Sequence, residues 1–286
     1  MTDLTAIILT KNEEQNIEEC LKSIEGFAKR AVVVDSGSDD KTVEIASSFD
    51  FVDVYSHPFE NYARQFNWAI DNTGISTKWT LRLDADERFT PELCSRLEKE
   101  CSEHENDDVN GFTLEAWLFF MGRKLTHGGG RKRKLMVFKT GIGRIEDRKM
   151  DEHTVLSCGE SISIEEKFLH YDFKDLNTYV KKLNWYATRE MQDYMEDRFP
   201  DTEFNASNSK ISKKRSKKTK YYKAPMFWRC WAYFCYAYFL KGNCLNGKEG
   251  FIYSFLYHLY YRLLVDAKIY EQMKFPKAFE NTGDLK

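Results

Sequence analysis

The chain has 286 residues, of which 42% are hydrophobic and 15% aromatic. This composition supports one large or two small folded domains and excludes intrinsic disorder for most of the chain. The net charge of −2 hides an asymmetry, because residues 1–209 have 27 Lys/Arg and 40 Asp/Glu whereas residues 210–286 have 16 and 5. The acidic part would repel a phosphate backbone, so we expect no nucleic-acid partner.

The first half alternates short apolar runs with helical patterns, which is typical of an α/β fold with parallel strands. We predict strands at 4–9, 31–34, 51–55 and 79–83, and helices that begin near residues 12, 41, 62 and 90. Asn12 is predicted to cap the first helix, with Gln15 at the capping-box position. The strand at 31–34 is wholly apolar, so we expect it to be buried on both faces.

After residue 110 the pattern is mixed, with candidate strands at 112–119 and 135–139 and a long helix at 175–198. Residues 200–223 are polar, and eight of the fourteen residues from Lys210 to Lys223 are Lys or Arg. Residues 224–273 are rich in aromatic side chains and predicted to be helical. No stretch reaches the roughly 20 uncharged apolar residues of a membrane span.

The N-terminal residues show no signal peptide pattern. The seven cysteines form no Cys-x-x-Cys pair, which argues against a disulfide framework and against a structural zinc site. We therefore expect a cytoplasmic protein.

Acidic residues follow three of the predicted strands: Glu13 after the first, Asp35 after the second, and Asp84-Ala85-Asp86 after the fourth. Ligands of open α/β sheets bind beyond the carboxyl ends of the strands. Residues i and i+2 of an extended segment point the same way, so Asp84 and Asp86 can hold Mn²⁺ or Mg²⁺. A lone acid here could be a helix cap or a solvated turn, but together the acids predict one crevice that needs a cation.

Three segments resemble the nucleotide-sugar-binding half of family 2 glycosyltransferases, which are inverting enzymes with the GT-A fold: Ile7–Glu13, Val32–Thr42 and Leu83–Glu87. Later segments are similar to the bacterial lipopolysaccharide-core and surface-polysaccharide branch of that family: Phe120–Arg123, His127–Gly129, Asp151–His153 and Leu169–Tyr171. The resemblance covers about residues 4–195.

The resemblance implies an α/β fold of GT-A type, with a Rossmann-like, mostly parallel sheet, a mixed second half and C-terminal aromatic helices. We predict a catalytic domain at 1–199, divided into a nucleotide-sugar-binding half (1–110) and an acceptor half (111–199). A basic linker at 200–223 and an aromatic helical tail at 224–286 would follow.

Site roles follow from the same resemblance. Asp86 matches the metal ligand. In some relatives a histidine that follows the catalytic base in the sequence completes the metal and diphosphate site, and His170 matches that histidine. The implied contacts to the nucleotide sugar are Thr10, Glu13, Asp35, Arg64, Asn67, Asp84 and Ala85. Two of these roles have an ordinary alternative, because Arg64 could be an exposed helix residue and His170 a satisfied core residue.

An inverting transferase needs a general base opposite the leaving nucleotide. Glu152 is our prediction for this base and Asp151 the second choice; a solvated acidic turn is the alternative. The branch usually has an Arg where Met136 stands, and this chain instead has the basic run 131–134, which could contact a phosphate or form a mobile hairpin. His127 is a weaker candidate.

Ala224–Leu240 contains a single charge, Arg229, and at about 1.5 Å per residue is short for a membrane span but suits a helix lying in the interface. The preceding basic run would be attracted to anionic lipid. The alternative is that these helices pack on the catalytic domain or on a second copy of the chain.

The predicted function is metal-dependent, inverting transfer of a sugar from a nucleotide sugar, with UDP expected as the nucleotide, to a lipid-linked saccharide or lipopolysaccharide. The enzyme would lie on the cytoplasmic face of the inner membrane. Two alternatives stay open: a sugar nucleotidyltransferase, disfavoured because residues 10–13 have no glycine, and a non-catalytic membrane-associated scaffold, which the acids argue against.

Overall fold

The computed structural model describes residues 1–128, 133–147, 153–195 and 220–275. The chain packs into two compact units, Met1–Phe119 with Gly130–Asp172, and Phe120–Gly129 with Phe173–Lys286. The predicted domain boundary after residue 199 stays a prediction, because residues 196–219 lie outside the described ranges. Packing groups the helix before them, α5 (Leu176–Met195), with the aromatic helices of the second unit.

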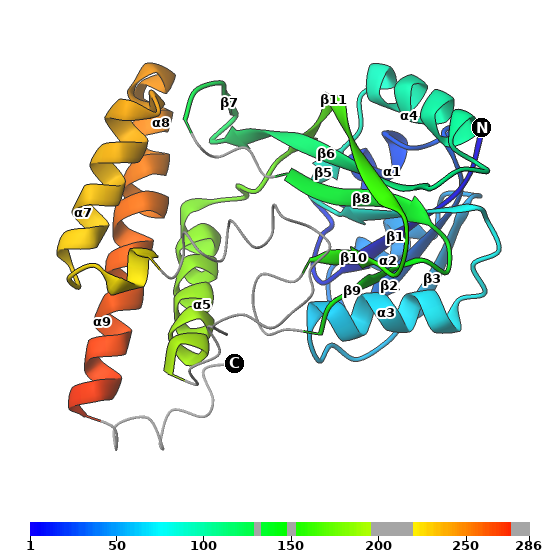
Figure 1. Ribbon diagram of the computed structural model, residues 1–286. Coiled ribbons are helices and arrows are strands. Elements are labelled where there is room, and N and C mark those ends of the chain that lie inside the picture. The colour runs from blue at the N-terminus through cyan, green and yellow to red at the C-terminus, as the bar shows by residue number, and fades with distance from the viewer. Residues whose placement is uncertain (129–132, 148–152, 196–219, 276–286) are drawn as a thin grey trace. The chain divides into compact units, whose positions relative to one another are not determined.

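The first unit begins with four parallel strands, β1 (Thr2–Thr10), β2 (Ala28–Asp35), β3 (Val52–Ser56) and β4 (Trp79–Asp84). Their order in the sheet is β3-β2-β1-β4, and Figure 1 labels β1, β2 and β3 within it. The register places Thr10 beside Asp35 and Leu9 beside Asp84. The carboxyl ends of these strands therefore meet at one edge of the sheet, as predicted from their sequences.

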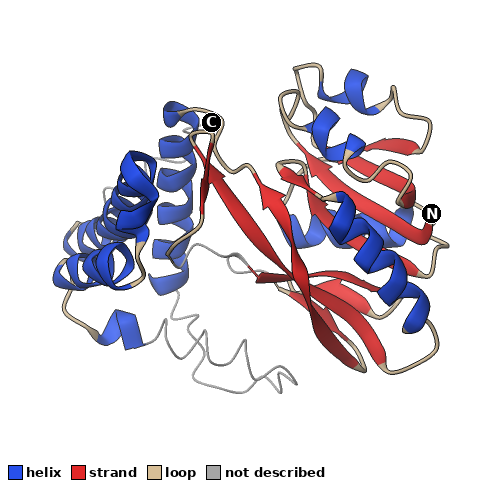
Figure 2. Cartoon of the chain, turned by 90° about the horizontal axis from the view of Figure 1, so that it is seen from above, coloured by secondary structure: helices blue, strands red, loops and turns tan. Residues whose placement is uncertain are grey.

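Beyond β4 the sheet is mixed and continues in the order β8 (Arg133–Lys139), β6 (Val109–Phe120), β11 (Glu160–His170) and β5 (Glu87–Arg88). Strand β8 is antiparallel to β4 and β6, and β11 is parallel to β6. Figure 2 shows the strands as one twisted sheet. A separate hairpin is formed by β9 (Gly143–Ile145) and β10 (Thr154–Leu156), and β7 (Arg123–Leu125) belongs to the second unit.

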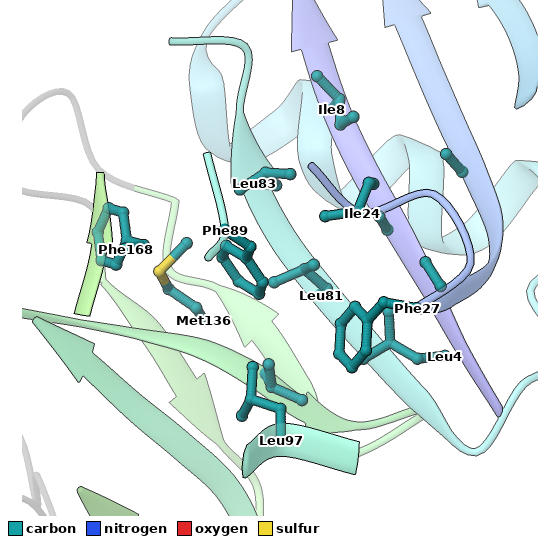
Figure 3. Packing of buried hydrophobic residues seen from close by; sticks show 14 of the residues in the cluster. Leu4, Ile8, Ile24, Phe27, Leu81, Leu83, Phe89, Leu97, Met136 and Phe168 are labelled. Carbon is teal, nitrogen blue, oxygen red and sulfur yellow. The ribbon is translucent and has the colours of Figure 1, made fainter. Parts of the chain in front are cut away.

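Helices cover both faces of the parallel strands. The core on one face packs α1 (Ile17–Lys22), α2 (Thr42–Ala46) and α4 (Pro91–Glu103) against the sheet, and Figure 3 shows Leu81 and Leu83 of β4 in it. The opposite face is covered by α3 (Tyr62–Asn72) through Phe66. The predicted fold class is confirmed in an α/β sheet whose parallel first part is followed by a mixed second half, and in the C-terminal aromatic helices.

The first helix starts later than predicted. It begins at Ile17 instead of near Asn12, because Asn12 has a positive φ of 56° and is used elsewhere. The Asn12 amide donates to Ser38 Oγ at 2.8 Å, and its side-chain oxygen accepts from the Asp39 amide at 3.0 Å. Asn12 therefore does not begin a helix but links the loop after β1 to the loop after β2.

The second unit is helical, with α5 followed by α7 (Trp228–Cys235), α8 (Gly247–Tyr253) and α9 (Tyr261–Lys274). Two π-helical segments, 236–240 and 254–260, and a 3₁₀ turn at 243–246 connect them. Glu190 of α5 accepts hydrogen bonds from the hydroxyls of Tyr222 and Tyr261 and from Arg262, which fastens α5 to α9. Within the described residues, no helix is long and apolar enough to cross a membrane.

Candidate active site

The loop after β2 is organised around the carboxylate of Asp35. Its Oδ1 accepts from Thr10 Oγ1 at 3.0 Å and from the Ser38 hydroxyl, and its Oδ2 accepts from the amides of Gly37 and Ser38, both at 2.8 Å. Burial raises the pKa of Asp35, but these hydrogen bonds outweigh that effect and lower it overall. Because a carboxylate offers about four lone-pair sites, a nucleobase would have to displace one of these internal donors.

At the end of β4, Asp84 is held between Tyr62 and Lys134. The Tyr62 hydroxyl donates to Asp84 Oδ1 at 2.8 Å, and Lys134 Nζ lies 2.5 Å from Asp84 Oδ2. Burial alone would raise the pKa of Asp84, but the neighbouring Lys134 and Arg82 hold it well below its usual range. Asp84 therefore has a protein cation beside it and is poorly placed to serve as a metal ligand as well.

Lys134 also contacts Glu87, the first residue of β5. Its Nζ is 2.5 Å from Glu87 Oε1, and Glu87 Oε2 accepts from the Asp84 amide at 3.1 Å. The Glu87 side chain is 1% exposed, and this burial raises its pKa despite the adjacent lysine. Lys134 is thus an internal counter-ion shared by two carboxylates at the edge of the sheet.

A second group of acids gathers around His170. His170 Nε2 lies 3.4 Å from Asp86 Oδ2, and the ligand atoms of Asp86, His170 and Asp172 lie within 4.8 Å of one another. His170 is 3% exposed, and its Nδ1 has no hydrogen-bond partner among the described residues. Two carboxylates and an imidazole form a donor set that suits Mn²⁺, so these residues fit a divalent cation.

Strand pairing explains how residues 84 positions apart meet. The short strand β5 pairs antiparallel with the end of β11, which puts His170 opposite Glu87 and next to the Asp84–Asp86 turn. The Tyr171 amide donates to the Asp86 carbonyl at 2.8 Å and continues this pairing. The Asp86–His170 contact is therefore built into the sheet.

Other predicted site residues have structural partners. Asn67 bonds to β9: its Oδ1 accepts from the Ile145 amide at 3.1 Å, and its Nδ2 donates to the Ile145 carbonyl at 2.8 Å. Arg64 is exposed and pairs with Glu60 and Asp147. Glu13 Oε2 accepts from Asn16, at the start of α1.

The remaining predicted residues are placed as follows. Ala85 is buried in the turn between Asp84 and Asp86. His127 lies in the second unit, where its amide donates to Asn246. The predicted bases, Asp151 and Glu152, lie outside the described residues, between β9 and β10 in the sequence. The roles assigned to all these residues stay predictions.

Four residues of this site were not predicted in the roles that the structure gives them: Tyr62, Glu87, Lys134 and Asp172. Asp172 had a signal, because it stands two residues after His170, and residues i and i+2 of an extended segment point the same way. Lys134 was predicted only as part of a basic run that could bind phosphate or lie in a mobile hairpin. Its partners come from β4 and β5, which no local pattern around residue 134 indicates.

Comparison with known proteins gives the family context. Residues 5–140 match the family model "Glycosyl transferase family 2". The lipopolysaccharide core biosynthesis glycosyltransferase LpsC of Rhizobium meliloti is 26% identical over 98% of this chain and 96% of that protein. An uncharacterized glycosyltransferase of Rickettsia bellii is also 26% identical, over 94% of this chain and 86% of that protein.

Among solved structures, one similar chain is S. aureus TarS 1–349 in complex with UDP. It is 14% identical, covers 74% of this chain and 68% of its own, and has a TM-score of 0.42.

Proposed function

We propose, from the family 2 model that matches residues 5–140 and from the relatives that match nearly the whole chain, that this protein is a family 2 glycosyltransferase: an inverting, metal-dependent enzyme that uses a UDP-sugar. The proposed acceptor is a lipid-linked saccharide or lipopolysaccharide core, because one of the relatives that match nearly the whole chain is named for core biosynthesis. Such an acceptor would place the enzyme at the cytoplasmic face of the inner membrane.

One observation supports the metal site above the rest: Asp86, His170 and Asp172 lie together although the sequence separates them. The alternative group, Asp84, Asp86 and Glu87, is also compact, but Lys134 already neutralises two of its members. Asp86, His170 and Asp172 are therefore the proposed ligands of Mn²⁺ or Mg²⁺. A divalent ion held there would stabilise the charge on the departing nucleoside diphosphate.

The proposed nucleotide contacts are the ends of β1, β2 and β4. Thr10 and Asp35 lie side by side at this edge, and Asp84 and Ala85 follow on the neighbouring strand. Glu13, Arg64 and Asn67 remain proposed contacts on the strength of the family resemblance. Asp84, fixed by Tyr62 and Lys134, would accept a hydrogen bond from a ribose hydroxyl without rearrangement, which favours preorganised binding.

Glu152 is the proposed general base, with Asp151 as the alternative within the pair. The base would take the proton of the acceptor hydroxyl while that oxygen bonds to the anomeric carbon. The bond from this carbon to the diphosphate breaks on the opposite side, so the configuration inverts. General-base assistance of this kind contributes about 10²–10⁴-fold.

The test is release of nucleoside diphosphate by the purified full chain from a panel of nucleotide sugars, with core saccharide supplied and Mn²⁺ present or chelated. We expect metal-dependent release that Asp86→Asn abolishes. The matched control is Asp50→Asn, since Asp50 is an exposed aspartate far along the sequence from the site. Equal release in chelator would refute the metal mechanism, and an anomer of retained configuration would refute inversion.

A further inference from the structure

The second unit has a continuous exposed aromatic surface. Six rings are linked by successive contacts, with centroid distances from 5.0 to 6.5 Å. They are Trp231, Phe234, Tyr238, Phe239, Phe251 and Phe255, and we call this surface the aromatic face. Trp231 and Phe239 are 51% and 61% exposed and Phe251 and Phe255 are also exposed, whereas Phe234 and Tyr238 are half-buried between them, so the face is open to solvent.

Helix geometry turns these rings away from the interior. Along residues 228–240 the buried positions are Arg229, Cys230 and Ala237, which share the opposite side of the helix. Phe251 and Phe255 stand four residues apart on the following helix, where Tyr253 and Ser254 point inward. Two helices therefore contribute to one apolar surface.

The aromatic face is uncharged, and its surroundings are basic. Arg229 is 4% exposed and is bonded to both carboxylate oxygens of the buried Asp266, so its charge is compensated inside the unit. The exposed charges between residues 220 and 248 are Lys220, Lys223, Lys241 and Lys248. The sequence from Lys210 to Lys248 contains eleven Lys/Arg and no Asp or Glu.

We propose that the aromatic face binds the surface of an anionic lipid bilayer, with the rings at headgroup level and the helices lying in the interface. Trp and Tyr favour that region because their rings are apolar and their tips are polar. The helices are too short and too polar to cross, and an apolar face beside Lys residues is the pattern of an interfacial helix. A surface of this kind needs anionic lipid as well as apolar contact.

Charge favours a bilayer over a second copy of the chain. A two-fold symmetric dimer would bring the same patch against itself, so the lysines near one aromatic face would meet the lysines near the other. The first acid after this basic stretch, Glu249, already pairs with Arg123. Anionic lipid offers the complementary charge. Each Lys near such a surface strengthens binding by about five-fold at moderate salt.

Flotation of the purified full chain with vesicles tests this proposal without donor or acceptor, so its result is independent of the proposed transferase activity. The vesicles are phosphatidylcholine alone, or phosphatidylcholine with an equal amount of phosphatidylglycerol. We expect binding only to the anionic vesicles, weaker but still present at 0.5 M salt. Trp231→Ser with Phe239→Ser should weaken binding at least ten-fold, because both side chains are exposed and large.

Phe59→Ser is the matched control, because Phe59 is an exposed aromatic in the first unit, 51% accessible, and should leave binding unchanged. Circular dichroism checks that each variant folds. The proposal is overturned if the wild-type chain does not float, or if the double variant floats as well as wild type. A wild-type dimer that ignores vesicles and becomes a monomer in the double variant would instead make this surface a subunit interface.

Discussion

Replacing Lys134 with Met should destabilise the first unit strongly, because it leaves Asp84 and Glu87 side by side without their shared cation. Removing one partner of a buried pair costs about 3–5 kcal/mol. Here Glu87 is 1% exposed but Asp84 and Lys134 are 28% and 19% exposed, so the lower end, about 3 kcal/mol, applies. For a unit of this size that lowers Tm by about 6–12 °C.

The assay is thermal unfolding of the purified chain followed by circular dichroism. Lys29→Met is the control, since Lys29 is 58% exposed and pairs with Asp3 in an ordinary surface bridge worth at most about 1 kcal/mol. Glu87→Gln added to Lys134→Met should restore part of the lost stability, because one uncompensated carboxylate is then gone. If Lys134→Met and Lys29→Met unfold at the same temperature, Lys134 is not the counter-ion of this site.

Three further predictions concern single residues. Glu152→Gln should lower transfer by about 10²–10⁴-fold while UDP-sugar binding stays normal; if Asp151→Asn is the impaired variant instead, the two roles are exchanged. Asp172→Asn should weaken Mn²⁺ binding by at least about ten-fold in calorimetry, the effect typical even of groups that only support a ligand, and unchanged affinity would exclude it from the site. Burial lowers the pKa of His258 to about 4. As the pH falls, the imidazole is therefore protonated in the unfolded chain before it is protonated in the folded one. The free energy of unfolding should thus fall by about 3 kcal/mol between about pH 6.5 and about pH 4. His258→Phe should remove that loss in urea titrations, and a pH-independent difference from wild type would contradict the assignment.

The carboxyl edge of the parallel sheet could be predicted from sequence, because each strand and the acid that follows it form a local sequence pattern. Apolar runs such as 31–34 indicate buried strands, and the acid after each strand must then lie at the shared edge. Asp35 and Asp84 lie at this edge for this reason, on the two strands that flank β1. The start of the first helix could not be predicted, because the Asn12 side chain and amide bond to Ser38 and Asp39 in the next loop.

The second half of the site depends on strand pairing between distant segments. The pairing of β5 with β11 places His170 beside Asp86, and nothing near either residue specifies that register. Resemblance to a known family suggested His170, and the spacing of Asp172 from His170 was a signal for that residue, whereas the counter-ion role of Lys134 emerges only once β8 is paired with β4. The pairing of strands that are distant in the sequence therefore could not be predicted from local patterns.

Titration of UDP into the full chain by calorimetry, with Mn²⁺ present or chelated, tests the central claim most directly. If the site holds a metal and a nucleoside diphosphate together, UDP should bind with Mn²⁺, lose at least ten-fold in affinity with chelator, and lose as much in Asp86→Asn with Mn²⁺ present. Asp50→Asn should bind as wild type does. UDP binding of equal strength with and without metal, or in Asp86→Asn, would contradict a metal-dependent site at Asp86, His170 and Asp172.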